Sequence, residues 1–120
     1  MKQLTKAEEE IMQILWQLER AAVKDIIAEL PDPKPAYNTV STIVRILENK
    51  GVVDYEKQGK GHIYFPILKK QDYSNASINN LVNNYFQGSF KSMVSFFVKK
   101  NDMNLKEVES ILKEIDSKDD

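Results

Sequence analysis

The sequence predicts a mainly α-helical protein with one small β-hairpin, in two parts that meet at residues 70 and 71. Apolar residues recur at three- and four-residue steps through the first fifty positions. β-branched and aromatic residues then bracket a glycine-containing turn within residues 52–67. A segment without charged residues, 73–90, opens a second set of helical patterns. The change of periodicity predicts the order of three helices, a hairpin and further helices.

The composition limits the class of protein. A chain of 120 residues, 42% of them hydrophobic, can bury one core and carry an appended element. It has no cysteine and one histidine, which argues against disulfides, metal sites and cysteine nucleophiles. We therefore expect no enzymatic activity, metal or cofactor. The first residues run directly into an acidic amphipathic pattern, unlike a signal peptide, so we expect a cytoplasmic protein without a membrane segment.

The first helix begins with a capping box. Thr5 and Glu8 have the spacing at which a hydroxyl and a carboxylate bond reciprocally to the backbone of the first turn. The helix dipole favours acidic residues there, so Glu8 to Glu10 require no catalytic role. The apolar positions of this helix and the next are Ile11, Ile14, Leu15 and Leu18, then Val23, Ile26, Ile27 and Leu30. The segment Pro31–Pro35 ends the second helix, because proline cannot continue it.

A third helix is predicted over Tyr37–Lys50, with Gly51 as its left-handed terminator. Its apolar face consists of Val40, Ile43, Val44 and Leu47. The opposite face is unusual for a solvated helix, because short hydrogen-bonding side chains and one arginine stand where Lys and Glu are common. These residues are Asn38, Thr39, Ser41, Thr42 and Arg45.

A β-hairpin follows the third helix. Residues 52–57 and 62–67 have the composition of strands, and Gln58–Gly61 has that of the turn between them. His62 begins the second strand, and with no second His and no Cys we interpret it as a surface residue instead of a ligand or a base. Trp16, in the first helix, is interpreted as a packing residue.

The distal segment predicts one helix over about residues 74–98 and another over about 104–116. Five asparagines interrupt the uncharged stretch, which excludes a membrane span. The apolar surface is larger than the first part could cover, so we expect it to form a homodimer. The residues assigned to this dimer surface are Ile78, Leu81, Val82, Tyr85, Phe86, Phe90, Met93, Val94, Phe97, Leu105, Val108, Ile111 and Leu112.

Three helices followed by a two-stranded wing is the order of a winged helix-turn-helix, whose third helix enters the DNA major groove. Residues 34–70 carry seven basic and three acidic side chains, a local charge of +4 that suits a polyanion. The candidate DNA-binding residues are Tyr37, Asn38, Thr39, Ser41, Thr42, Arg45, Lys57 and Lys60. The alternative is a winged-helix module for protein–protein interaction without DNA binding.

Several motifs resemble the penicillinase-repressor (BlaI/MecI) family of bacterial transcriptional regulators, and the resemblance spans nearly the whole chain. The Tyr-X-Thr-Val-X-Thr element at residues 37–42 is the most specific of them. The others are Leu4-Thr5 through Glu8, Ile14-Leu15-Trp16, Val23-Lys24-Asp25-Ile26, the segment Arg45–Gly51, Gly61-His62-Ile63-Tyr64-Phe65-Pro66 and Gly88-Ser89-Phe90-Lys91-Ser92-Met93-Val94.

This resemblance implies a homodimeric repressor that reads a palindromic operator with its third helix and dimerises through its C-terminal helices. It also implies a partner protease, activated by a membrane sensor of β-lactams, that cuts the dimerisation region. The family is cut at an Asn-Phe bond, and Phe96 stands here where the Asn would be. The candidate cleavage site is therefore Ser95, Phe96 and Phe97. The copper-responsive branch senses metal through C-terminal cysteines, which this chain lacks.

Overall fold

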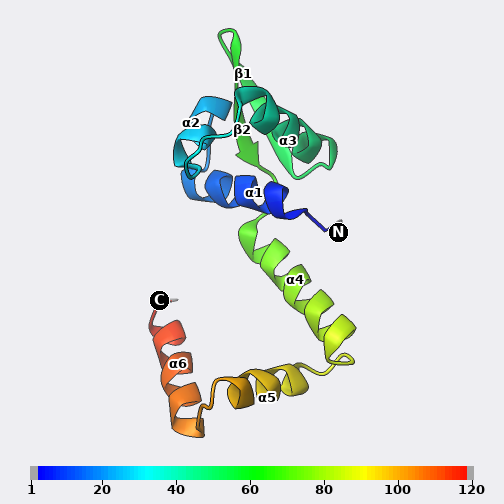
Figure 1. Cartoon of the computed structure of the whole chain (residues 1–120), viewed down its shortest axis with the longest axis vertical. Helices are drawn as coiled ribbons and strands as arrows, with labels where there is room; N and C mark the ends of the chain where they lie inside the picture. Colours follow the sequence, from blue (N-terminus) through cyan, green and yellow to red (C-terminus); the bar gives the residue numbers. More distant parts are fainter. Residues whose placement is uncertain (1–2, 119–120) are drawn as a thin grey trace. The chain divides into compact units, whose positions relative to one another are not determined.

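The computed structural model describes residues 3–118, without the side chains of Leu112 and residues 115–118 (Figure 1). The chain divides into two compact units between Ser77 and Ile78. The first unit contains α1 (Lys6–Leu18), α2 (Val23–Glu29), α3 (Tyr37–Asn49), β1 (Val53–Gln58) and β2 (Gly61–Pro66). This mainly helical order with one hairpin confirms the predicted fold class, a winged helix-turn-helix followed by further helices.

Local signals set the ends of the first-unit helices as predicted. Thr5 Oγ1 accepts a hydrogen bond from the Glu8 amide at 3.2 Å, and Glu8 Oε1 accepts one from the Thr5 amide at 3.1 Å, which completes the capping box of α1. Gly51 follows α3 with φ of +78°, a conformation that glycine adopts without strain.

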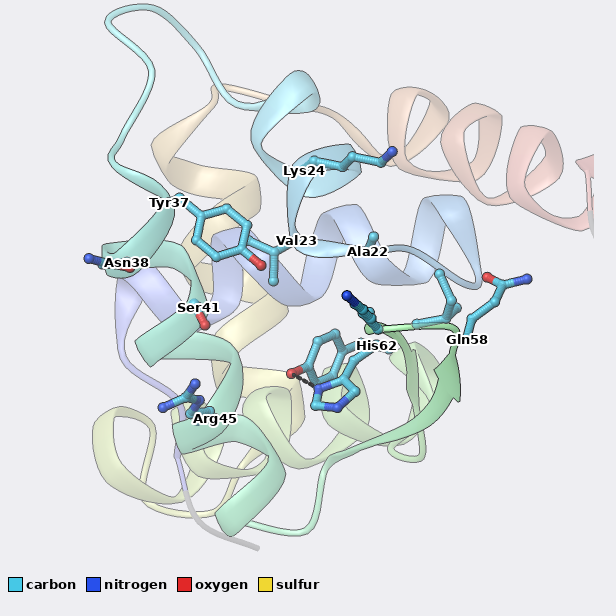
Figure 2. Close-up of a pocket in the computed structure, with 13 residues that line it drawn as sticks. Ala22, Val23, Lys24, Tyr37, Asn38, Ser41, Arg45, Gln58 and His62 are labelled. Carbon is cyan, nitrogen blue, oxygen red and sulfur yellow. Dashed lines mark hydrogen bonds between the residues drawn. The ribbon is translucent and has the colours of Figure 1, made fainter.

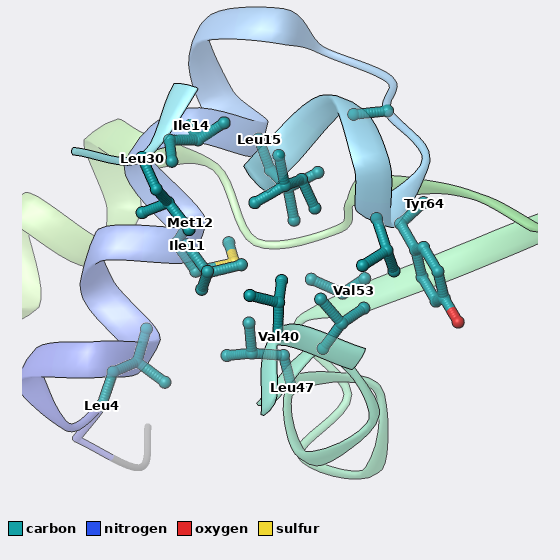
Figure 3. Close-up of a cluster of buried hydrophobic side chains, with 14 of the residues drawn as sticks. Leu4, Ile11, Met12, Ile14, Leu15, Leu30, Val40, Leu47, Val53 and Tyr64 are labelled. Atoms are coloured by element: carbon teal, nitrogen blue, oxygen red, sulfur yellow. The ribbon is translucent and has the colours of Figure 1, made fainter. Parts of the chain in front are cut away.

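The core of the first unit lies where α1, α2 and α3 meet the base of the hairpin (Figure 3). Each helix contributes the apolar face that its periodicity predicts, and Val53 of β1 and Tyr64 of β2 close the cluster. The largest fully buried side chains are Met12, Leu15, Ile26, Val40, Val44, Leu47 and Val53. Burial of this face of α3 leaves its polar face turned outward.

The hairpin projects from the first unit as the wing (Figure 1). The strands pair antiparallel with Tyr55 opposite Tyr64 and Gln58 opposite Gly61, so Gly59 and Lys60 form a two-residue turn. Ala21, between α1 and α2, exchanges two backbone hydrogen bonds with Tyr64, of 2.9 and 2.8 Å. The base of the wing is thereby attached to the helices.

The beginning of α4 (Lys70–Tyr85) is anchored in the first unit by Tyr73. Its ring lies 6.0 Å from that of Trp16, and its hydroxyl donates to Glu9 Oε1 at 2.5 Å. The Trp16 indole in turn donates to the Leu68 carbonyl at 2.8 Å. The interpretation of Trp16 as a packing residue is confirmed.

The second unit contains the rest of α4, together with α5 (Phe90–Lys100) and α6 (Leu105–Lys118). The expectation of one helix over 74–98 was wrong, because the chain turns between α4 and α5. Gln87 and Gly88 have φ of +53° and +79°, and Ser89 Oγ then caps α5 by accepting from the Ser92 amide at 3.1 Å. No helix within residues 3–118 is long and apolar enough to cross a membrane.

Candidate nucleic-acid interface

The outward face of α3 follows directly from its buried face. Val40, Val44 and Leu47 point into the core, so residues one turn apart on the other side, such as Asn38, Ser41 and Arg45, point away from it. Asn38 and Arg45 are exposed and Ser41 is half-buried. The face therefore presents an amide, a hydroxyl and a guanidinium to a partner.

This face borders a groove of about 530 Å³ between the start of α2, the first turns of α3 and the wing (Figure 2). Figure 2 shows Tyr37, Asn38, Ser41 and Arg45 along α3, with His62 and Gln58 on the opposite, wing side. The lining residues are Ala22, Val23, Lys24, Tyr37, Asn38, Ser41, Arg45, Gln58, Lys60, Gly61, His62, Ile63 and Tyr64. We call this concavity the α3–wing groove.

The structure brings five of the eight candidate DNA-binding residues into the α3–wing groove. These are Tyr37, Asn38, Ser41, Arg45 and Lys60. Thr39, Thr42 and Lys57 are exposed but do not line it. The Thr42 hydroxyl donates to the Asn38 carbonyl at 2.8 Å, so its proton is already engaged and its oxygen can only accept further hydrogen bonds.

Eight further residues that the sequence did not assign to the site line the groove, and among them Lys24, Gln58 and His62 have polar side chains turned to its surface or its rim. Lys24 belongs to α2, and only the packing of α2 against α3 brings it to the groove. Gln58 and His62 stand at the two sides of the wing turn. Their polar side chains beside the predicted turn were the signal available in the sequence.

The charge of the groove suits an anionic partner. Lys24, Arg45 and Lys60 line it, and no carboxylate does so among the described residues. Tyr64 also lines the groove, and burial and the nearby Glu48 carboxylate raise the pKa of its phenol. A cationic concavity beside a hydrogen-bonding helix face is the arrangement that lets a protein hold a phosphate backbone while it reads base edges.

A pair of interactions on the outer side of the wing supports its position. The Arg20 guanidinium donates to Glu56 of β1 at 2.6 Å and lies 5.6 Å from the ring centre of Phe65 in β2. The hydrogen bond and charge of Arg20 hold the pKa of the Glu56 carboxyl below its usual value. Because the pair is exposed, its contribution is mainly to orientation.

The second unit exposes most of the apolar residues assigned to the dimer surface. Tyr85 is 75% exposed and Leu105 is 74% exposed. The other exposed members are Ile78, Leu81, Phe90, Val94, Phe97 and Ile111. Phe86 and Val108 are half-buried, Val82 and Met93 are buried within this chain, and the Leu112 side chain lies outside the described residues.

An apolar groove of about 440 Å³ runs between α4 and α5 in this surface. Leu81, Tyr85, Phe86, Phe96 and Phe97 line it. The rings of Phe86 and Phe97 each lie 5.5 Å from that of Phe96, so the three aromatics form one cluster. The candidate cleavage segment Ser95–Phe97 is thus helical, within α5, and two of its side chains line this groove.

The polar face of α3, the cationic groove beside it and the attached wing define a winged-helix DNA-binding protein. The sequence bears out this class over nearly its whole length, because the penicillinase repressor family model matches residues 4–117. The chain therefore belongs to the penicillinase repressor family. The predicted family is confirmed, and with it the description of the chain as a DNA-binding repressor.

Individual relatives agree with this assignment. Methicillin resistance regulatory protein MecI of Staphylococcus aureus (strain N315) is 30% identical over 110 residues, which are 91% of this chain and 89% of that protein. The solution structure of the DNA binding domain of the repressor BlaI has a TM-score of 0.52 at 28% identity, covering 59% of this chain and 88% of that one. The solution structure of the Bacillus licheniformis BlaI monomeric form in complex with the blaP half-operator has a TM-score of 0.50 at 27% identity. The match covers 60% of this chain and 89% of that one.

Proposed function

We propose that this repressor binds a palindromic operator as a homodimer, with α3 of each copy in a major groove and each wing on the neighbouring backbone. The observation that carries the proposal is the α3–wing groove, in which three cations and a hydrogen-bonding helix face meet and no carboxylate of residues 3–118 is among the lining side chains. The BlaI monomeric form in complex with a half-operator supports the DNA-binding part of this proposal.

Each side chain of the site has a role that its chemistry allows. Asn38 offers the paired donor and acceptor that match the edge of adenine, and Arg45 offers the fork that matches guanine. Ser41 and Thr42 supply hydroxyl oxygens to bases or phosphates. Lys57, at the end of β1, and Lys60, in the wing turn, neutralise phosphates and release counterions.

Dimerisation is assigned to the second unit. Its exposed aromatic and aliphatic residues would otherwise face water, and a second copy of the same surface can cover them. Two linked copies present two α3 helices to the two halves of a palindrome. Binding of the first half then raises the effective concentration of the second, which strengthens the whole complex.

Relief of repression is assigned to proteolysis by a sensor-activated partner at Ser95–Phe97. A cut there separates α6 and the end of α5 from the rest of the dimer surface in one irreversible step. Because this segment is helical, α5 must unwind locally before a protease can bind it. Phe96 in place of the family Asn requires a protease pocket that accepts an aromatic ring.

A pull-down of genomic fragments with the full chain tests DNA binding and identifies the operator together. We expect enrichment of a duplex with two inverted half-sites, and a steep loss of affinity as salt is raised. Absence of any salt-dependent binding to recovered or random duplexes would leave the protein-interaction module as the function of this fold.

A further inference from the structure

His62 occupies a position in the fold that its place in the sequence does not reveal. It is the one histidine of the chain. Its exposed side chain stands on the wing side of the α3–wing groove, across from Arg45 (Figure 2). It also lines a smaller concavity toward the end of α3, together with Arg45 and Glu48. The imidazole therefore lies between the two elements that approach DNA.

The imidazole ring is held in place by two tyrosines of the wing. Its centre lies 4.6 Å from that of Tyr55, and it meets the ring of Tyr64 edge to face at 6.1 Å. The Tyr64 hydroxyl lies 3.4 Å from Nδ1 of His62. The Tyr64 phenol can donate its proton to Nδ1 when that nitrogen is unprotonated. In the neutral ring Nε2 then carries the proton, and no described residue hydrogen-bonds to it.

The charged groups around His62 come from four parts of the first unit. They are Lys24 of α2, Arg45 and Glu48 of α3, Lys57 directly opposite on β1, and Lys60 of the turn. Tyr37, across the groove, and Tyr55 and Tyr64 of the wing are the other titratable neighbours. Cations thus outnumber the single carboxylate. A phosphate bound in the groove would place a negative charge beside the imidazole and favour its protonated form.

We propose that His62 is a DNA contact of the wing, which donates from Nε2 to a backbone phosphate oxygen and strengthens this contact when it is protonated. The inference rests on the proposed function, because it assigns a further residue to the same groove. If bound DNA increases the affinity of the imidazole for a proton, protonation of the imidazole must increase the affinity of the protein for DNA by the same factor. The affinity for DNA should therefore fall as the pH rises through the range in which histidine loses its charge.

The test compares DNA affinity at about pH 6 and about pH 8, at one ionic strength, with the full chain and the labelled genomic duplex recovered in the pull-down. We expect the wild-type affinity to be about three- to tenfold higher at the lower pH for each wing engaged. His62→Gln retains a neutral N–H donor but cannot be charged, so this ratio should fall below about twofold.

Lys60→Gln is the matched control. It removes a wing charge but keeps the imidazole, so it should weaken binding at both pH values while the affinity still falls as the pH rises. A second measurement uses the single imidazole C–H signal in the NMR spectrum of the wild type. Added duplex should move its titration midpoint to higher pH.

Each outcome has one meaning. A His62→Gln variant with the wild-type pH ratio, or an imidazole midpoint that DNA does not move, overturns the assignment of His62 and leaves the proposed function standing. A wild-type protein that binds no duplex at either pH overturns the proposed function, and the assignment of His62 falls with it.

Discussion

Lys50 Nζ lies 2.7 Å from each carboxylate oxygen of Glu8, and this pair ties the end of α3 to the first turn of α1. Glu8 is 4% exposed, and its carboxylate also accepts from the Thr5 amide at 3.1 Å. The helix that carries the candidate DNA-binding face is thereby fixed to the capped end of another helix. Removal of either charge leaves the other without its partner. If Lys50 is removed, the unpaired charge is the Glu8 carboxylate, which is almost fully buried.

Lys50→Met should destabilise the protein by about 3 kcal/mol, because it leaves the buried Glu8 carboxylate without its cation. Equilibrium unfolding in urea at neutral pH measures this as a lower midpoint. Glu8→Gln combined with Lys50→Met removes both charges and should recover part of the loss. If the free energy of unfolding of Lys50→Met lies within about 0.5 kcal/mol of the wild-type value, the pair contributes little to stability.

The same pair makes stability depend on acid pH. Burial raises the pKa of Glu8, but the hydrogen bonds from Lys50 and Thr5 outweigh it and hold the pKa below the usual 4.5. A carboxyl group whose pKa is lower in the folded protein than in the unfolded chain stabilises the fold at pH values above its unfolded-state pKa. This stabilisation is lost as the pH falls through the pKa of the folded state. The free energy of unfolding should therefore drop below about pH 4.5, and drop less in Glu8→Gln, as measured by urea midpoints across that range.

Asn38→Ala and Arg45→Ala should each weaken operator binding by about tenfold or more, because a lost base contact costs about 1–3 kcal/mol. Lys60→Ala should weaken binding to all sequences alike and reduce its dependence on salt. Lys6→Ala removes the same charge outside the α3–wing groove and serves as the control. Equal, small effects of all four substitutions in fluorescence anisotropy would argue against the α3 face as the reading surface.

A chain ended after Ser77 should remain a folded monomer that binds the operator far more weakly, because two half-sites are no longer linked. A chain ended after Lys70 should also lose stability, since it lacks Tyr73 and its contacts with Trp16 and Glu9. Light scattering and thermal melts of the two fragments and the full chain measure both effects. A monomeric full chain at micromolar concentration contradicts the assigned dimer surface.

Derepression should produce a fragment that ends between Ser95 and Phe97, detected by mass in induced cells of the source organism. Phe96→Asn is the informative variant, because a pocket shaped for an aromatic ring would leave the amide unpaired and slow the cut. Intact wild-type protein throughout derepression rules out proteolysis here. Faster cleavage of the variant would show that the partner protease prefers the family's Asn.

Features that depend on a few neighbouring residues were readable from the sequence. The Thr5 and Glu8 capping box, the Gly51 terminator and the two-residue turn at Gly59 each rest on local backbone geometry. The apolar periodicity of α3 identified its buried face and therefore its polar one, which includes Asn38 and Arg45. The break at Gln87 and Gly88 was local as well, but the apolar spacing that continues across it concealed the turn.

Only the tertiary structure decided which distant residues meet. Glu8 and Lys50 are 42 residues apart, and Tyr73 reaches Glu9 across 64. His62 looked like an isolated surface residue until the antiparallel register and the attachment of Ala21 to Tyr64 set the wing beside α3. Local patterns determine helices, strands and their apolar faces, whereas such long-range contacts depend on how those faces pack, which no short window of sequence contains.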